Sequence, residues 1–532
     1  MSNSSPASNL TSDVTFSMMA KVLYLITRLG LPPMILAHVT LAEYGLWSAC
    51  FILIGYIGMA DLGLATAYVR GASRMHASND IAGIGSMLST GMTLMAGVAL
   101  VLLTLIVVTL PNLMNLLKID SAGRATATLL IIGTAAIFLV DMSVSAFAYV
   151  LHGLQQYRAE QRNWVAAFML ELVLIIAFLL GGMGIFSLMA AFMLRLGYSM
   201  VANMRVAYRV LPGLSVSLRQ FDRRLLRGFL GSGMVMQANS LMAIGLQSVD
   251  KLAAGIILGP ASIALFDIGA KLPAAAISIP SAISQLAMPA AARLPPAERS
   301  FRQDWQQDPL AQLYVKTSRS CMLMASLMNS FLAAFSIPLC VAWLGQRAGF
   351  DVLPLLMTLT ACSTALHVST GPGSAVFRGC GRLGNEFVYH GLRMLLSALA
   401  LGTLYYFMAA SVAMLAIALS LALAVAAVLY MAHNHRALGL PLTHLLTRIL
   451  LPGLLPFGIG ALLYLAWRLI VPADTGRWPT LALLALFGAL HLGLCGLAIW
   501  RLLDGDERGK LEALATRILA RFERVQPSWM SR

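Results

Sequence analysis

Long apolar stretches dominate this chain of 532 residues. About fourteen of them are long enough to cross a bilayer as α-helices, which takes roughly 20 residues each. Inside a bilayer the protein itself must satisfy every backbone N–H and C=O group, so a chain with so many apolar stretches forms a helical bundle. The chain is 59% hydrophobic and only 11% charged, whereas soluble domains carry about 25% charged residues. The composition therefore predicts an all-α integral membrane protein.

The basic residues indicate how the helices are oriented. Counted over alternate gaps between helices, roughly 27 of the 37 Lys and Arg residues fall on one side of the membrane and about six on the other. This distribution predicts that both chain termini are cytoplasmic. It also accounts for the net charge of +15 without a nucleic-acid partner. The helices are expected near 13–37, 43–67, 82–110, 125–151, 164–181, 184–204, 229–250, 262–291, 315–344, 352–377, 384–408, 410–431, 446–470 and 479–501.

A weak internal repeat predicts two related halves. Aligning Lys21 with Ser240 also aligns Arg28 with Gln247, so that polar positions fall on polar positions. We therefore expect two pseudo-symmetric lobes of six helices around a central cavity, an architecture common among secondary transporters. The expected parts are a cytoplasmic tail (1–12), the first lobe (13–210), a basic linker (211–228), the second lobe (229–431), two additional helices (432–501) and an amphipathic basic cytoplasmic tail (502–532).

Two cations lie within the first predicted helix. A charged side chain at bilayer depth costs on the order of 3 kcal/mol, so Lys21 and Arg28 are not expected to face lipid. Their spacing corresponds to about two helical turns, which places both on one face of the helix. We expect this face to line a water-filled cavity that attracts anions.

Other predicted helices carry polar stripes that would line the same cavity. On the seventh and eighth helices the polar residues lie within a narrow sector of the helical wheel. Other interpretations remain open: Asp267 and Lys271, at i and i+4, would neutralise each other, and Lys251 beside Asp250 would lie at a helix interface. The candidate substrate-binding residues are Lys21, Arg28, Asp61, Gln237, Gln247, Lys251, Asp267 and Lys271.

Several short motifs carry a family resemblance. The chain contains Glu43-Tyr44-Gly45-Leu46-Trp47, then Asp61-Leu62-Gly63-Leu64, and later Asp250-Lys251 followed by Leu258-Gly259-Pro260. Over roughly residues 13–431 it resembles the bacterial polysaccharide flippases, which translocate O-antigen and exopolysaccharide precursors. These belong to the multidrug, oligosaccharidyl-lipid and polysaccharide exporter (MOP) superfamily. It departs from the family pattern at Ala37-His38-Val39 and by its two additional helices.

The resemblance implies a function in the bacterial inner membrane. It implies a two-lobed bundle that works by alternating access on undecaprenyl diphosphate bearing a short oligosaccharide, beside a polysaccharide polymerase or export machinery. By this likeness Lys21, Arg28, Lys251 and Lys271 would meet the diphosphate or acidic sugars. No cofactor or metal is expected, and a coupling ion, H⁺ or Na⁺, is left open.

Two other functions remain as alternatives. A multidrug or cation antiporter of the same superfamily would need acidic groups in the cavity. A polysaccharide polymerase or ligase would need a large outer loop, and the short outward gaps argue against this function. The sequence carries no nucleophile elbow, zinc signature or phosphate-binding loop, so we expect no enzyme. Gly379–Gly384 is interpreted as a turn, His433 and His435 as surface residues, and Asp141, Glu171 and Arg195 as pairing partners.

Overall fold

The computed structural model describes residues 27, 29–61, 64–225, 234–294, 308–345, 349–407, 410–472 and 475–502, together with 505, 508, 509, 512 and 516. Over these residues the chain is helical and contains no strand. Nine of the described helices are long and apolar enough to cross a membrane by themselves, and three pairs of bent helices raise the number to as many as twelve. The prediction of an all-helical, multi-pass membrane protein is confirmed.

The chain divides into two compact units. Unit 1 comprises residues 1–275, 343–360 and 381–426, and unit 2 comprises 276–342, 361–380 and 427–532. The predicted boundaries of the two lobes, the linker and the additional helices stay predictions.

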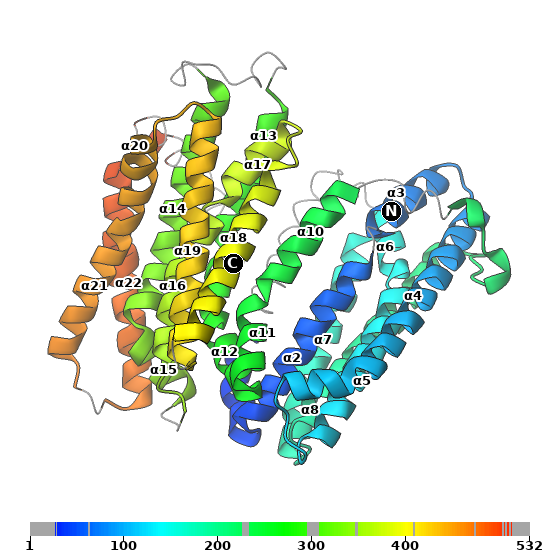
Figure 1. The fold of residues 1–532 in the computed structure, drawn as a ribbon. Helices are drawn as coiled ribbons and strands as arrows, with labels where there is room; N and C mark the ends of the chain where they lie inside the picture. Colours follow the sequence, from blue (N-terminus) through cyan, green and yellow to red (C-terminus); the bar gives the residue numbers. More distant parts are fainter. Residues whose placement is uncertain are drawn as a thin grey trace, which may run out of the picture. The chain divides into compact units, whose positions relative to one another are not determined.

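Unit 1 contains a bundle in which α7 packs against α8, α4 against α5, and α5 against both α2 and α8 (Figure 1). An edge-to-face cluster of Trp47, Phe51 and Phe192, with ring centroids 5.1 to 6.0 Å apart, joins α2 to α8. The elements that begin in unit 1 are α2 (Leu41–Gly58), η1 (Met59–Asp61), α3 (Leu64–Ala77), α4 (Ile81–Leu116), α5 (Arg124–Val144), α6 (Ala146–Gly153), α7 (Tyr157–Leu180), α8 (Phe186–Val210), η2 (Leu218–Gln220), α10 (Met234–Gln247), α11 (Val249–Leu258), α12 (Pro260–Ala276), α16 (Leu353–Val368), α18 (Asn385–Phe407) and α19 (Val412–Ala437).

Unit 2 is built on α14, which packs against α13, α17, α21 and α22. Its cores include a cluster in which alanines such as Ala287 and Ala291 pack against Tyr314 and Phe377, and an aromatic cluster around Phe335. The elements that begin in unit 2 are α13 (Ser278–Ala292), α14 (Pro309–Ala334), α15 (Ser336–Leu344), α17 (Gly371–Gly379), α20 (Leu442–His444), η4 (Leu445–Leu450), α21 (Leu451–Ile470) and α22 (Arg477–Leu502).

Three predicted helices become sharply bent pairs of helices. The predicted helix 229–250 becomes α10 and α11, which meet at an angle of 44°, and 315–344 becomes α14 and α15, which meet at 70°. The predicted helix 262–291 becomes α12 and α13, separated by Ile277. Two of these breaks have the same cause. Pro280 and Pro338 lack the N–H group that would bond to the last residue of α12 and of α14, four positions earlier.

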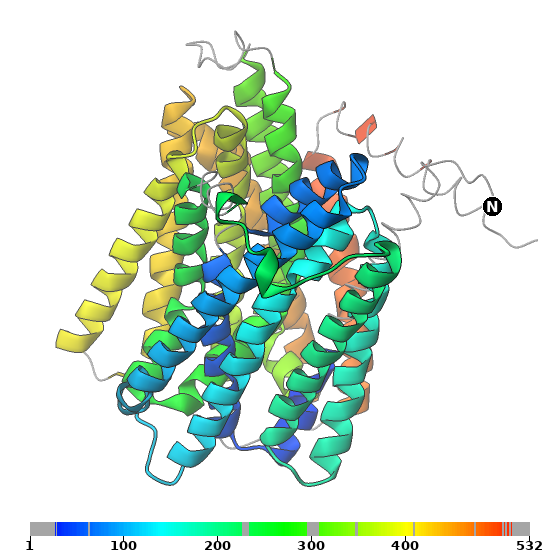
Figure 2. The ribbon, with the colours of Figure 1, turned by 90° about the vertical axis from the view of Figure 1, so that its right-hand side faces the viewer.

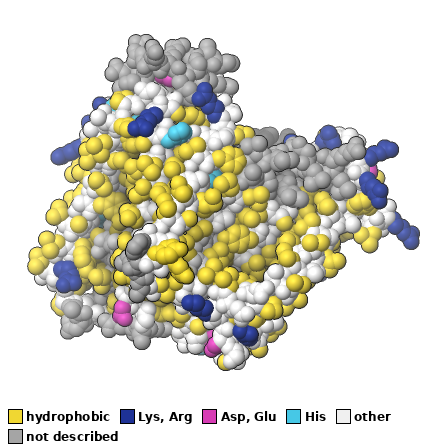
Figure 3. Space-filling model, viewed as in Figure 1, with side chains coloured by type: hydrophobic (Ala, Val, Ile, Leu, Met, Phe, Trp, Pro, Cys, Tyr) yellow, Lys and Arg dark blue, Asp and Glu magenta, His cyan; other side chains and the backbone are white. Residues whose placement is uncertain are grey.

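Helix surfaces match a lipid environment. Leu100 on α4 and Leu469 on α21 are 68% and 81% exposed, which would be costly in water. On the face shown in Figure 3, apolar side chains cover the flanks of the helices, while most Lys and Arg side chains lie near helix ends. The sixth predicted helix forms as α8 but is not among the candidate spans. Of the first predicted helix, the structure describes Leu29–His38, an apolar helix that is shorter than a candidate span. The motif Gly379–Gly384 forms the turn between α17 and α18, as predicted.

Candidate functional site

The beginning of α2 is fixed by a capping box. The side chain of Thr40 accepts a hydrogen bond from the Glu43 N–H group, and the Glu43 carboxylate accepts one from the Thr40 N–H group at 2.9 Å. Such reciprocal bonds satisfy two backbone donors that a helix end leaves free. They set the position of the first turn, in which Tyr44 lies.

A close backbone contact brings this turn to α12. A Cβ atom at Gly45 would lie 1.8 Å from the carbonyl oxygen of Pro260, so only glycine permits the approach. Pro260 begins α12 directly after Gly259, whose φ of +90° also favours glycine. Ser262 Oγ reinforces the turn by donating to the Ala254 carbonyl at 2.7 Å. Local chemistry in two distant segments thus places α2 beside α12.

Two lysines share one carboxylate at this contact. Nζ of Lys251 on α11 lies 2.6 Å from Oδ1 of Asp267, and Nζ of Lys271 lies 2.6 Å from Oδ2. The hydroxyl of Tyr44 donates to Asp267 at 3.4 Å, and Lys271 lies 5.9 Å from the centre of the Tyr44 ring. The three charged side chains keep 16 to 25% of their surface exposed, so the cluster stays accessible.

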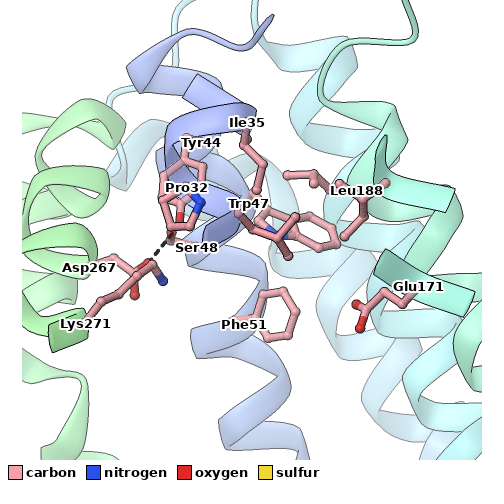
Figure 4. A pocket seen from close by; sticks show the side chains of 12 residues that line it. Pro32, Ile35, Tyr44, Trp47, Ser48, Phe51, Glu171, Leu188, Asp267 and Lys271 are labelled. Atoms are coloured by element: carbon pink, nitrogen blue, oxygen red, sulfur yellow. Dashed lines mark hydrogen bonds and ion pairs between the residues drawn. The ribbon is translucent and has the colours of Figure 1, made fainter. Parts of the chain in front are cut away.

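The cluster borders a cavity of about 250 Å³ in unit 1. Figure 4 shows Asp267 and Lys271 on one side of this cavity, Trp47 and Phe51 of α2 along it, and Glu171 on the opposite side. Aromatic and aliphatic side chains line most of the wall, with a few convergent polar groups, as is typical of binding pockets.

Glu171 belongs to a second ion pair. Its Oε2 lies 3.3 Å from Nε of Arg195, and only 3% of the Glu171 side chain is exposed. The prediction that Glu171 and Arg195 pair with one another is confirmed, and Arg195 also interacts electrostatically with Asp141, although no described ion pair includes Asp141. Among the described residues, the charged side chains that line the cavity are Asp267, Lys271 and Glu171, and Lys251 and Arg195 pair with the two carboxylates from just outside the lining.

The structure brings together three of the predicted site residues and leaves the others apart or undescribed. Lys251, Asp267 and Lys271 meet. Gln247 is the exposed last residue of α10 and does not line the cavity. Lys21 and Arg28 lie outside the described residues, and the side chains of Asp61 in η1 and Gln237 in α10 are also outside them.

Sequence reasoning missed Tyr44 as a site residue. The only signal is its place in the motif Glu43–Trp47, because its contact with Asp267 spans 223 residues. The prediction that His435 is a surface residue is wrong. His435 is fully buried in α19, where its Nδ1 lies 2.9 Å from the Tyr314 hydroxyl, because α19 continues to Ala437. His433 is exposed, as predicted.

An all-helical, multi-pass bundle that holds ion pairs around a cavity within its apolar helices has the features of a membrane transporter. Comparison with solved structures identifies the fold. The chain is similar to the lipid II flippase MurJ in an inward closed conformation, with a TM-score of 0.65 and 12% identity over 92% of this chain and 99% of MurJ. It is also similar to an inward-facing multidrug resistance MATE family transporter of the MOP superfamily, with a TM-score of 0.56 and 18% identity over 80% of this chain and 94% of that transporter.

These similarities establish a fold shared with MOP superfamily transporters. No protein-family profile and no curated protein sequence matches the chain. At 12% and 18% identity the similarity shows the fold but does not identify the substrate.

Proposed function

We propose that this protein is a flippase of the bacterial inner membrane that carries undecaprenyl-diphosphate-linked oligosaccharide from the inner to the outer leaflet. The observation that carries this proposal is the cluster of two lysines on one carboxylate beside the cavity of unit 1. The similarity of the fold to a lipid II flippase supports a lipid-linked substrate.

The cluster fits an anionic headgroup because it holds one more cation than anions. Asp267 holds both lysine ammonium groups at 2.6 Å and orients them, and one positive charge remains uncompensated within the cluster. Lysine acts as a point charge for phosphate, and an electrostatic interaction in a partly desolvated cavity is stronger than in water. A diphosphate that enters the cavity would therefore gain a charged partner at Lys251 or Lys271 without displacing Asp267 from both lysines.

Transport then follows from alternating access. The headgroup crosses within the protein while the polyprenyl tail stays in lipid. An interior-negative membrane potential assists the outward movement of an anion by up to about 2.3 kcal/mol per charge per 100 mV. We propose H⁺ or Na⁺ as a further source of coupling, and a polysaccharide polymerase or export machinery as the partner that consumes the product.

A multidrug or cation antiporter is the second candidate. The fold of the MATE transporter supports it, and two carboxylates, Asp267 and Glu171, line the cavity. Both carboxylates already face cations at 2.6 to 3.3 Å, and a proton or Na⁺ would have to compete with these cations. This arrangement favours the anionic substrate. A polymerase or ligase is the least supported function.

The test is a flipping assay with purified protein in proteoliposomes. A polyprenyl-diphosphate oligosaccharide with a fluorescent label on its sugar is incorporated, and dithionite added outside reports how much label crosses. Lys251→Gln with Lys271→Gln should reduce the rate at least tenfold. Lys118→Gln is the matched control, since Lys118 is exposed, lies outside the cavity lining and donates to the Ile257 carbonyl.

The same vesicles separate the two candidates. A proton gradient is imposed, and efflux of a cationic dye is followed. Dye efflux that depends on Asp267, without movement of the labelled lipid, would establish the antiporter and refute the flippase. Flipping that is unchanged in the double lysine variant would also refute the proposed role of the cluster.

A further inference from the structure

The segment 211–225, which follows α8, is bound to the beginning of α4. Ser86 Oγ donates to the Gln220 carbonyl at 2.9 Å. The N–H group of Asp222 donates to Thr90 Oγ1, also at 2.9 Å. Figure 2 faces this side of α4. These bonds hold the segment in one register along the helix.

The fit between the segment and α4 is close. A Cβ atom at Gly85 would lie 2.4 Å from the Ser215 carbonyl oxygen, so the backbones touch at a position that only glycine permits. The N–H group of Ser217 donates to Ser89 Oγ at 3.0 Å, and Ser89 is buried. The segment is therefore packed against α4 as part of unit 1, and these contacts fix the positions of its side chains.

One of those side chains borders an apolar groove. Phe221 and the face of α4 from Thr93 to Leu102 line a groove of about 580 Å³. The hydroxyl of Thr93 donates a hydrogen bond to the Ser89 carbonyl at 2.7 Å, so this hydroxyl needs no hydrogen-bond acceptor from a ligand in the groove. Gly97 leaves open space, because a Cβ atom there would meet nothing within 4 Å.

Helix α4 is longer than the hydrocarbon core of a bilayer is thick. Its 36 residues extend about 54 Å at 1.5 Å per residue, against roughly 30 Å for the hydrocarbon core. Ile81 lies about 18 Å along the axis from Thr93, so α4 is long enough for the part that binds the segment to extend beyond the hydrocarbon core.

The segment also carries positive charge beside apolar surface. Arg219, Arg223 and Arg224 are exposed, and Asp222 is the one acid between them. Leu218 is 76% exposed and Phe221 37%. Exposed apolar side chains flanked by arginines are typical of protein surfaces that lie in the headgroup region of a membrane with anionic lipids.

We infer that the groove and the three arginines form a binding site for an anionic phospholipid of the cytoplasmic leaflet. One acyl chain lies in the groove against Phe221, and the phosphate lies among Arg219, Arg223 and Arg224. The charge of the segment selects an anionic over a zwitterionic headgroup, since each arginine near a membrane surface strengthens the attraction about fivefold. This site is separate from the transport cavity and does not depend on the proposed function.

Native mass spectrometry of the full-length protein in detergent tests the headgroup. Phosphatidylglycerol and phosphatidylcholine with identical acyl chains are titrated, and we expect at least tenfold tighter binding of phosphatidylglycerol. The triple variant Arg219→Gln, Arg223→Gln, Arg224→Gln should lose this preference. The matched triple Arg74→Gln, Arg205→Gln, Arg209→Gln, which neutralises three exposed arginines elsewhere in unit 1, should retain it.

A second pair of variants tests the groove. Gly97→Phe fills the open space and should lower phosphatidylglycerol binding at least fivefold. Gly197→Phe on α8, where a Cβ atom also meets nothing within 4 Å, should leave binding unchanged. The inference is overturned if the two lipids bind equally, if the arginine variant keeps the preference, or if Gly97→Phe binds as the unaltered protein does. A dimer without bound lipid, lost in Gly97→Phe, would instead show that a second copy covers the groove.

Discussion

Lys251 Nζ lies 2.6 Å from Oδ1 of Asp267, and this contact joins α11 to α12 across the turn at Gly259 and Pro260. Because Lys271 already occupies the other oxygen at 2.6 Å, Lys251 changes the cluster from a neutral pair to a cationic site. The proposed anion binding depends on this third member.

Removing the central carboxylate should destabilise the protein. Asp267→Asn leaves two partly buried ammonium groups close together, and we expect a loss of roughly 1 to 3 kcal/mol. Adding Lys271→Gln should recover part of the loss, since one of the two repelling charges is then gone. Thermal unfolding of the purified single and double variants measures the coupling. Strictly additive effects would show that the two residues do not interact.

Neutralising both cations of the first predicted helix should abolish polymer export. The double variant Lys21→Gln, Arg28→Gln removes two charges that their helical spacing predicts on the cavity face, while the amount of protein in the membrane should stay near normal. Export of polymer from cells and the abundance of the protein are measured together. Undiminished export would refute a role for these residues.

Gly45 should tolerate no side chain. Gly45→Ala puts a methyl group against the Pro260 carbonyl, 1.8 Å from its oxygen, so α2 and α12 must separate and we expect a loss above about 3 kcal/mol or failure to fold. Gly55→Ala in the same helix meets nothing within 4 Å and should be neutral or stabilising by up to about 1 kcal/mol. Comparable yield and melting temperature for both variants would contradict the close contact.

The pair Glu171 and Arg195 should be structural. Glu171→Gln alone removes the carboxylate that pairs with Arg195 at a largely buried position, and we expect a loss of roughly 1 to 3 kcal/mol. Glu171→Gln with Arg195→Gln should recover part of this loss and retain transport, because only Asp141, which also faces Arg195, then loses a charged neighbour. The flipping assay and thermal unfolding together decide this. A stable double variant that no longer transports would assign the pair a role in the transport cycle.

His491 should hold α22 to α14. It is fully buried, and its Nε2 lies 2.9 Å from Ser330 Oγ. His491→Leu replaces this contact by a side chain of similar size and should cost about 1 kcal/mol, as interhelical hydrogen bonds in membranes do. The exposed His433, changed in the same way, is the control. Equal melting temperatures for the two variants would count against the contact.

Part of the site could be read from spacing alone. Asp267 and Lys271 are four residues apart on one predicted helix, so their pairing needs no information beyond helix geometry. The contact of Lys251 depends on how the turn at Gly259 and Pro260 directs α12. The contact of Tyr44 depends on Gly45 meeting Pro260. Neither contact has a local signature in the sequence. For the same reason Gln247 does not line the cavity: this residue belongs to the predicted polar stripe, but α10 ends at it and its side chain is exposed.

The sequence by itself determined that this chain is a helical membrane protein, approximately where its helices begin and end, and which helix carries Asp267 with Lys271. Apolar length and helical periodicity are local properties, so they act before any tertiary contact forms. The tertiary structure decided that Lys251 and Tyr44 join Asp267, that Glu171 faces the same cavity, and that His435 is buried. The contact of Lys251 arises from the turn at Gly259 and Pro260, and the burial of His435 from the packing of α19 against Tyr314. The contact of Tyr44 arises from the approach of the Gly45 backbone to Pro260, and residues that lie more than two hundred positions apart cannot encode their meeting in any local pattern.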